Sequence, residues 1–169
     1  MTKIAAGLER AFAQKGFAAP SVETLRDAAG VSLRTLYKYT PSREEMVHAA
    51  LEHRHRRYIE QVFHDLPEDG DLALSAVIDR VATWMAREAS HGCLFHAAVA
   101  AAPQDRRLRA LLKRHKAEVA ERAAAAIGRP DHDVELTIIL EGLTQSWPLC
   151  GDAAVASAKK MAKALIEPA

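Results

Sequence analysis

The sequence predicts an all-α protein with a small N-terminal head of three helices and a larger helical body. Strand-like alternation is absent, and no run of β-branched residues is longer than Thr137-Ile138-Ile139. Good helix formers fill the stretches between Gly- and Pro-rich breaks, the first at 16–20 and the last at 148–151. We therefore expect about nine helices.

The breaks and the signals beside them define each helix. Ser21 and Ser42 stand where a side chain can cap a first turn, and Glu44 and Glu45 place two acids in the turn after Ser42. The fourth helix is long enough to join a head at 1–47 to a body at 48–169. The expected helices are 2–15, 22–29, 33–39, 43–65, 72–90, 94–101, 104–127, 131–147 and 152–166.

Composition limits the class of protein. The 169 residues are 49% hydrophobic and 27% charged, which is typical of a globular chain and excludes disordered and collagen-like classes. No window approaches the apolar length of a membrane span, and the first ten residues do not form a signal peptide. Two cysteines cannot form a disulfide framework and suit a reducing compartment. We expect a soluble, cytoplasmic protein.

Two short helices joined by a tight turn are the most specific feature of the head. Residues 22–29 and 33–39 flank Gly30, which can take the left-handed conformation that ends a helix, while Ser32 can cap the next one. This arrangement is typical of a helix-turn-helix. The second helix offers hydroxyl and cationic groups that suit DNA phosphates and base edges. A plain helical hairpin with a solvated polar face is the alternative.

The charge distribution agrees with a nucleic-acid-binding end. Residues 1–40 hold six Lys or Arg and three acids, although the whole chain has a net charge of only +1. A basic head on a mildly acidic body is compatible with DNA as a partner.

On these residues, positions 4–51 resemble the DNA-binding head of the TetR family of transcriptional regulators. The resemblance implies a homodimer that binds a palindromic operator and represses until a small-molecule effector releases it. The helix at 43–65 would then set the spacing of the two heads. The matching segments are Ala11-Phe12, Lys15-Gly16-Phe17, Ser21-Val22, Ala28-Ala29-Gly30-Val31-Ser32, Thr35-Leu36-Tyr37-Lys38-Tyr39 and Ser42-Arg43-Glu44-Glu45-Met46.

The same resemblance implies individual contacts with double-stranded DNA. Leu33, Arg34 and Thr35 would face bases, and the other residues would cap helices or meet phosphates. The expected set is Ser21, Ser32, Leu33, Arg34, Thr35, Tyr37, Lys38, Tyr39 and Arg43.

Three positions depart from the family pattern. Thr40 stands where the family has an anchoring phenylalanine, and Leu25-Arg26 replaces an Ile-Ala pair. Leu33 cannot donate a hydrogen bond to a base, although it can contact a thymine methyl. These departures leave open a second function, a helical protein-interaction module that has lost operator binding. An enzyme is not expected, because the chain lacks a phosphate loop, a nucleophile elbow and a His-Glu-x-x-His motif.

The body contains two expected surfaces. Helices 131–147 and 152–166 would form the dimer interface through Ile138, Gly142, Trp147, Ala158, Met161 and Leu165, with an intrachain core as the alternative. A ligand pocket would be lined by Trp84, Met85, Phe95, His96, Arg122 and Trp147, with plain core packing as the alternative.

Cysteine and histidine carry the remaining expectations. Cys93, beside His91 at a helix start, suits either a redox sensor or simple packing. The spacing of the histidines and cysteines is not that of a metal site, so we expect no metal and no cofactor. His48, His53, His55 and His64 are expected on a solvated, weakly basic face of helix 43–65.

Overall fold

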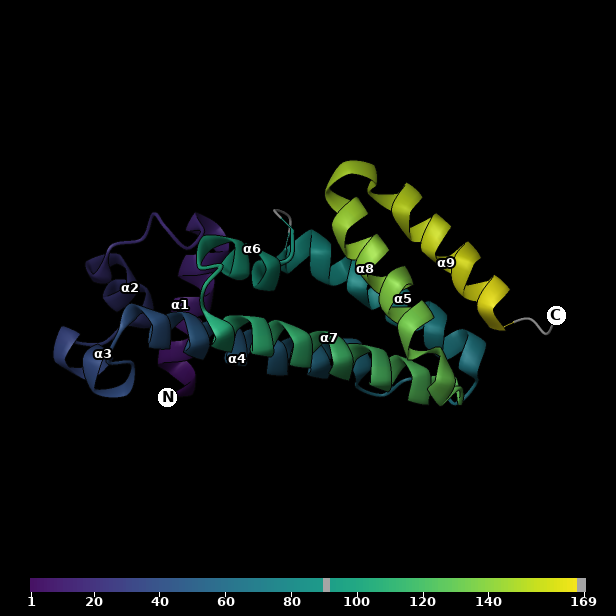
Figure 1. The fold of residues 1–169 in the computed structure, drawn as a ribbon, viewed down its shortest axis with the longest axis horizontal. Helices are drawn as coiled ribbons and strands as arrows, with labels where there is room; N and C mark the ends of the chain where they lie inside the picture. The colour runs from purple at the N-terminus through teal and green to yellow at the C-terminus, as the bar shows by residue number, and fades with distance from the viewer. Residues whose placement is uncertain (90–91, 167–169) are drawn as a thin grey trace. The chain divides into compact units, whose positions relative to one another are not determined.

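The structure, a computed structural model, describes residues 1–89 and 92–166. All regular elements in these ranges are helical, which confirms the predicted all-α class (Figure 1). No helix among them is long and apolar enough to cross a membrane. The elements are α1 (Thr2–Lys15), α2 (Val22–Ala29), α3 (Leu33–Tyr39), α4 (Arg43–Phe63), α5 (Gly70–Glu88), α6 (Leu94–Ala101), α7 (Arg106–Ala126), a short 3₁₀ turn η1 (Pro130–His132), α8 (Asp133–Cys150) and α9 (Asp152–Ile166).

Helices α1, α2, α3, α6 and α9 have the predicted bounds, and side-chain caps explain the different starts of α5 and α7. The side chain of Asp69 accepts a hydrogen bond from the Leu72 amide (2.9 Å), so α5 begins two residues earlier than predicted. The side chain of Asp105 accepts from the Leu108 amide (3.1 Å), so α7 begins two residues later. Both caps satisfy amides that a first turn leaves without an intrahelical partner.

The predicted end of α8 before Pro148 is wrong, since the helix continues through this proline to Cys150. A proline in a helix removes one hydrogen bond to the carbonyl four residues earlier. Pro148 is exposed and lies in the last turn of α8, where the missing hydrogen bond costs the helix little stability. The Gly151 amide then donates to the Trp147 carbonyl (2.9 Å) and closes the helix.

The chain forms two compact units. The first contains residues 1–57 and 94–112, and the second contains residues 58–93 and 113–169. The predicted boundary between 47 and 48 falls within the continuous helix α4, and it stays a prediction.

The core of the first unit joins α1, α2 and α3 through fully buried side chains. Leu8 and Phe12 of α1, Leu25 of α2 and Leu36 of α3 are all fully buried, and α2 contacts both α1 and α3. Gly7 allows α1 and α2 to approach closely, because a Cβ there would lie 2.2 Å from the carbonyl oxygen of Ala28. The three helices are therefore held as one small bundle.

A buried carboxylate ties α1 to α4 within the same unit. Glu9 is 2% exposed and accepts hydrogen bonds from His53 Nδ1 (2.5 Å), Arg54 (3.1 Å) and Arg57 (2.7 Å). A charge removed from water needs partners of this kind.

The expectation of a solvated histidine face on α4 is wrong for three of the four histidines. His48 and His55 are buried, and the His53 side chain is only 12% exposed. The buried Glu9 draws His53 inward, and His64 alone of these four is largely exposed.

The second unit has a hydrophobic core supplied mainly by α5, α8 and α9, which contact one another. Leu74 and Ile78 of α5 pack with Leu136 of α8 and Ala158 of α9. Figure 1 shows α8 and α9 side by side, joined by a turn at Gly151. Burial of these apolar side chains is the main source of stability for such a layer.

Candidate nucleic-acid interface

Two serine caps and one glycine shape the helix-turn-helix. The Ser21 hydroxyl accepts from the Thr24 amide (3.2 Å), and the Ser32 hydroxyl accepts from the Thr35 amide (3.1 Å). Gly30 lies in the left-handed region with φ of 64°, and its amide donates to the carbonyl of Arg26 (3.0 Å). The turn therefore has the geometry that the sequence predicts.

Helix α3 has one buried side and an exposed side rich in polar groups. Leu36 is completely buried and anchors the helix to its unit. The opposite side exposes hydroxyls and cations together with Leu33, which is 39% exposed. The exposed members of the predicted set on and beside α3 are Ser32, Leu33, Arg34, Tyr37, Lys38 and Tyr39, and Thr35 is half-buried.

The end of α3 accommodates the polar residue that departs from the family pattern. Thr40 is 1% exposed, and its hydroxyl donates to the Leu36 carbonyl (2.9 Å). The buried hydroxyl is therefore satisfied within the helix end, and Thr40 fills the anchoring position without an aromatic ring.

The second departure is also compatible with the head. Leu25 is fully buried in the core, whereas Arg26 extends outward and forms a 2.6 Å ion pair with Asp27. A long cation at this position therefore does not enter the core.

Arg43 has an intramolecular role that the sequence did not reveal. Its guanidinium donates to the carbonyls of Phe17 (2.7 Å) and Pro20 (3.0 Å), and it lies 5.9 Å from the Phe12 ring centroid. These contacts fix the loop that leads into α2. The predicted phosphate contact of Arg43 stays a prediction.

Charged groups near α3 are also held in place at the start of α4. The Ser42 hydroxyl holds the pKa of Glu44 below its usual value of 4.5, because it donates a hydrogen bond to the ionised carboxylate. Arg107 at the start of α7 does the same for the pKa of Glu45 through a hydrogen-bonded ion pair. Both acids are thus ionised at neutral pH beside the end of α3.

Comparison with known proteins identifies this head. Residues 4–50 match the family model of bacterial regulatory proteins, tetR family. Residues 4–50 therefore carry the domain that this family model describes. No curated protein sequence matches the chain.

Solved TetR-family structures share the fold along the whole chain. A TetR-family transcriptional regulator from Streptomyces coelicolor aligns with a TM-score of 0.77 at 17% identity, over 97% of this chain and 92% of that one. GusR from Salmonella enterica aligns with a TM-score of 0.69 at 17% identity, over 97% and 93% of the two chains. A TetR transcriptional regulator from Rhodococcus sp. RHA1 aligns with a TM-score of 0.61 at 18% identity, over 98% and 93%. At these identities the TM-scores show a shared fold alone, and the shared fold extends over the body as well as the head.

The body exposes apolar side chains on α8 and α9. Among the six residues predicted for a dimer interface, Ile138 is 65% exposed, Met161 and Gly142 are exposed, and Trp147 and Leu165 are half-buried. Ala158 is 1% exposed and belongs to the intrachain core, the alternative noted from sequence. The exposed Leu149 of α8 was missed, although it continues the apolar pattern of the exposed Val134 and Ile138.

The six predicted pocket residues do not gather around one described cavity. Trp84 and Met85 are buried in the core of the second unit, and Arg122 is exposed and pairs with Glu118 (2.9 Å). Trp147 is half-buried, and its indole Nε1 is buried without a hydrogen-bond partner. The remaining two, Phe95 (buried) and His96 (exposed), belong to the first unit.

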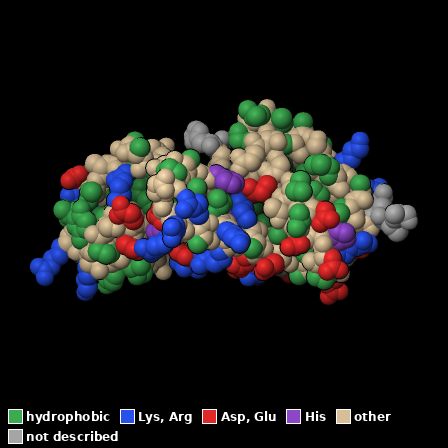
Figure 2. All heavy atoms as spheres, viewed as in Figure 1, with side chains coloured by type: hydrophobic (Ala, Val, Ile, Leu, Met, Phe, Trp, Pro, Cys, Tyr) green, Lys and Arg blue, Asp and Glu red, His purple; other side chains and the backbone are tan. Residues whose placement is uncertain are grey.

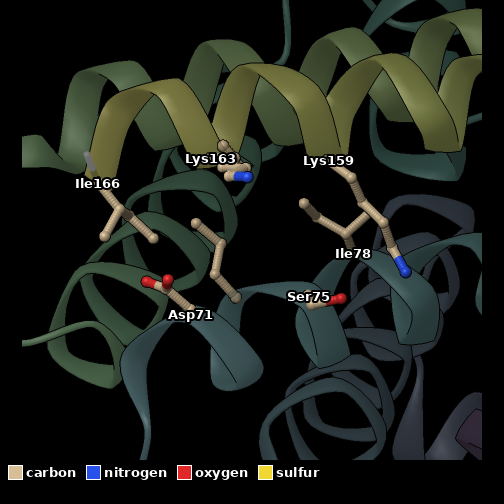
Figure 3. A pocket seen from close by; sticks show the side chains of 8 residues that line it. Asp71, Ser75, Ile78, Lys159, Lys163 and Ile166 are labelled. Carbon is tan, nitrogen blue, oxygen red and sulfur yellow. The ribbon is translucent and has the colours of Figure 1, made fainter.

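A cavity of about 230 Å³ lies instead between α5 and α9 (Figure 3). Its deepest side chains are Leu74 and Ile78, both fully buried members of the core. Lys159 on its α9 wall pairs with Asp79 (2.7 Å). The cavity is lined by Asp71, Leu74, Ser75, Ile78, Lys159, Ala162, Lys163 and Ile166, which repeat at helical spacing on both helices.

Cys93 is half-buried immediately before α6, and its sulfur lies 3.6 Å from the ammonium of Lys116. Lys116 also forms a 2.5 Å ion pair with Glu141. His91, the predicted neighbour of this thiol, lies outside the described residues. Within the described part of the chain, no group of three His, Cys, Asp or Glu side chains is arranged to hold a metal ion.

Proposed function

We propose that this protein is a one-component repressor that binds a palindromic operator as a homodimer and is released by a small-molecule effector. The observation that carries the proposal is α3, a capped helix anchored by Leu36 whose opposite side exposes Arg34, Tyr37 and Lys38. A helix with a buried anchor and exposed donors suits the major groove of DNA.

The contacts in this proposal divide into base recognition and backbone positioning. Leu33, Arg34 and Thr35 lie at the start of α3 and would face base edges. The remaining predicted residues would meet phosphates, namely Ser21, Ser32, Tyr37, Lys38, Tyr39 and Arg43. The exposed Leu33 supports a contact with a thymine methyl, because an isolated apolar side chain at this position gains burial only against a partner.

The proposed dimer interface is the exposed apolar face of α8 and α9. Val134, Ile138 and Gly142 follow one another at intervals of four residues, and Leu149 is 87% exposed near the end of the same helix. Such a row of exposed apolar side chains is typical of an isologous interface between two copies of a chain.

Release would follow from differential binding. A ligand that prefers a state with a different spacing of the heads lowers operator affinity by its difference in binding free energy between the two states. Helix α4 is continuous from the head into the second unit and is the proposed lever. The cavity between α5 and α9 is one candidate effector site. The pocket predicted from sequence is the other, and there the buried indole Nε1 of Trp147 would be a polar group available to a ligand.

The test is selection of bound sequences from a random DNA pool, followed by affinity measurements on the selected site. We expect a palindromic site, and Arg34→Ala should cost about 1–3 kcal/mol of binding free energy and relax one base preference. Arg26→Ala is the matched control, because Arg26 is a cation on the neighbouring helix that is outside the contact set. Absence of any sequence enrichment would contradict the proposal and favour the interaction module.

A further inference from the structure

The first half of α7 carries an unusual concentration of positive charge. No acid occurs from Arg106 to Ala117, and Figure 2 shows Lys and Arg side chains gathered over the part of the molecule where α7 begins. The basic residues of this segment are Arg106, Arg107, Arg109, Lys113, Arg114 and Lys116.

Contacts within the chain neutralise part of this charge. Arg107 pairs with Glu45, and Lys116 pairs with Glu141. Arg109 donates to the carbonyl of Pro103, an uncharged acceptor, so its positive charge remains uncompensated by that contact. Asp105, the acid just before α7, is occupied with the amides of the first turn.

Three of the exposed cations share one stripe of the helix. Arg106, Arg109 and Lys113 stand at i, i+3 and i+7, which places them along about 10 Å of one face. The exposed residues between and beyond them on this face are the small side chains of Ala110 and Ala117. We call Arg106, Arg109 and Lys113 the α7 stripe.

We propose that the α7 stripe is a second DNA-contacting surface that binds phosphates without reading bases. The proposal rests on the DNA-binding function proposed above. Arg106 and Arg109 belong to the same compact unit as α3, so a part of the stripe is built into the DNA-binding unit. Duplex DNA presents one negative charge per about 1.7 Å of its axis, which suits a short row of cations.

The chemistry of the stripe favours DNA over other anionic partners. A protein partner needs buried aromatic or aliphatic anchors, and a membrane surface needs an apolar side chain to insert. Between its cations the stripe offers only alanine methyl groups. Long flexible cations without apolar anchors suit the sequence-independent contact with a phosphate backbone.

The test measures salt dependence on a duplex of about 40 base pairs with random sequence. The variant Arg106→Gln/Lys113→Gln removes two cations and keeps good helix formers. Each lost phosphate contact lowers the slope of log affinity against log salt by about 0.9, so the slope should fall by about 1.8. The control Arg87→Gln/Lys160→Gln removes the same charge from exposed positions on α5 and α9, and its slope should equal that of the wild type.

The outcomes separate the two proposals. If the wild type binds its selected operator and the stripe variant keeps the wild-type slope, the stripe proposal is overturned while the regulator proposal stands. If the wild type binds neither operator nor random duplex, the regulator proposal itself fails. Circular dichroism and the melting temperature test whether each variant is folded. In a folded variant, a smaller slope of log affinity against log salt reports lost phosphate contacts.

Discussion

Glu9 illustrates how strongly one residue can depend on its surroundings. Its carboxylate lies inside the first unit, where His53, Arg54 and Arg57 of α4 compensate its charge. Arg54 is itself buried, so both charges of the Glu9–Arg54 ion pair are removed from water and must compensate each other. The sequence shows only an acid on an otherwise apolar side of α1.

Replacing Glu9 by Gln should therefore destabilise the protein severely. The substitution removes the buried negative charge that His53, Arg54 and Arg57 share, and removing one partner of a buried ion pair typically costs about 3–5 kcal/mol. Urea denaturation monitored by circular dichroism measures the loss of unfolding free energy. Glu60→Gln is the control, because Glu60 is a largely exposed residue of α4 whose pair with His64 contributes about 0.5 kcal/mol or less. Equal stabilities of the two variants would contradict a structural role for the buried cluster.

At the scale of elements, close packing of α1 on α2 depends on one glycine. A Cβ at position 7 would lie 2.2 Å from the Ala28 oxygen and 2.5 Å from the Ala29 Cα. These are backbone atoms, which cannot move aside without shifting α2.

The substitution Gly7→Ala distinguishes packing from helix propensity, because the two effects change the stability of the protein in opposite directions. Propensity alone predicts that alanine stabilises a helix interior by about 0.5–1 kcal/mol relative to glycine. The clash predicts instead a loss of about 1–3 kcal/mol, and weaker DNA binding if α2 shifts. Thermal unfolding measures the sign directly, and a more stable variant would refute the close approach of the two helices.

The contact between α4 and the start of α7 should be sensitive to acid. Hydrogen bonding to Arg107 lowers the pKa of Glu45 from its usual 4.5, so the pair adds stability above that pH and loses it as the pH falls through the lowered pKa. Arg107→Gln should therefore reduce the melting temperature at pH 7, and the difference from wild type should close below pH 4.5.

Arg109→Gln provides the matched control for this pH dependence. Arg109 donates to a backbone carbonyl, which does not titrate, so its effect on the melting temperature should be independent of pH. A constant difference for Arg107→Gln across the same range would show that Glu45 is not its titrating partner.

At the scale of the whole molecule, the proposed dimer makes a separate prediction. Ile138→Glu places a charge on the exposed face of α8 and should yield a monomer in analytical ultracentrifugation. The two heads of such a variant are no longer linked, so they cannot bind a palindromic operator as one unit. The affinity of the protein for the operator should then fall by about tenfold or more. Ala125→Glu changes an exposed residue of α7 away from this face and should remain dimeric. A dimeric Ile138→Glu protein would place the interface elsewhere.

Much of the helix-turn-helix was predictable because its signals are local. Ser21, Ser32 and Gly30 form hydrogen bonds with amides and carbonyls only three or four residues away. Their spacing in the sequence is therefore enough to predict these bonds. Leu36 was predictable as the anchor of α3 because helical periodicity separates it from the polar residues around it. The exposed positions of Arg34 and Tyr37 follow from the same periodicity.

Side chains that meet residues distant in sequence were not predictable in this way. Arg43 contacts carbonyls more than 20 residues earlier, and Glu9 meets cations more than 40 residues later. His53 looked solvated because no local pattern indicates that Glu9 of α1 supplies a carboxylate to it, and the buried His48 lies 3.5 Å from Asp105, which is also distant in sequence.

The sequence by itself determined the all-α class, the order of the helices, the capped recognition helix and the resemblance to the TetR family. These properties depend on hydrogen bonds and periodicities within a few residues. Only the tertiary structure decided that Thr40 is satisfied in its buried site, that the body cavity lies between α5 and α9, and that Ala158 belongs to the intrachain core. The reason is physical, because burial and charge compensation are set by whichever distant elements the fold brings together.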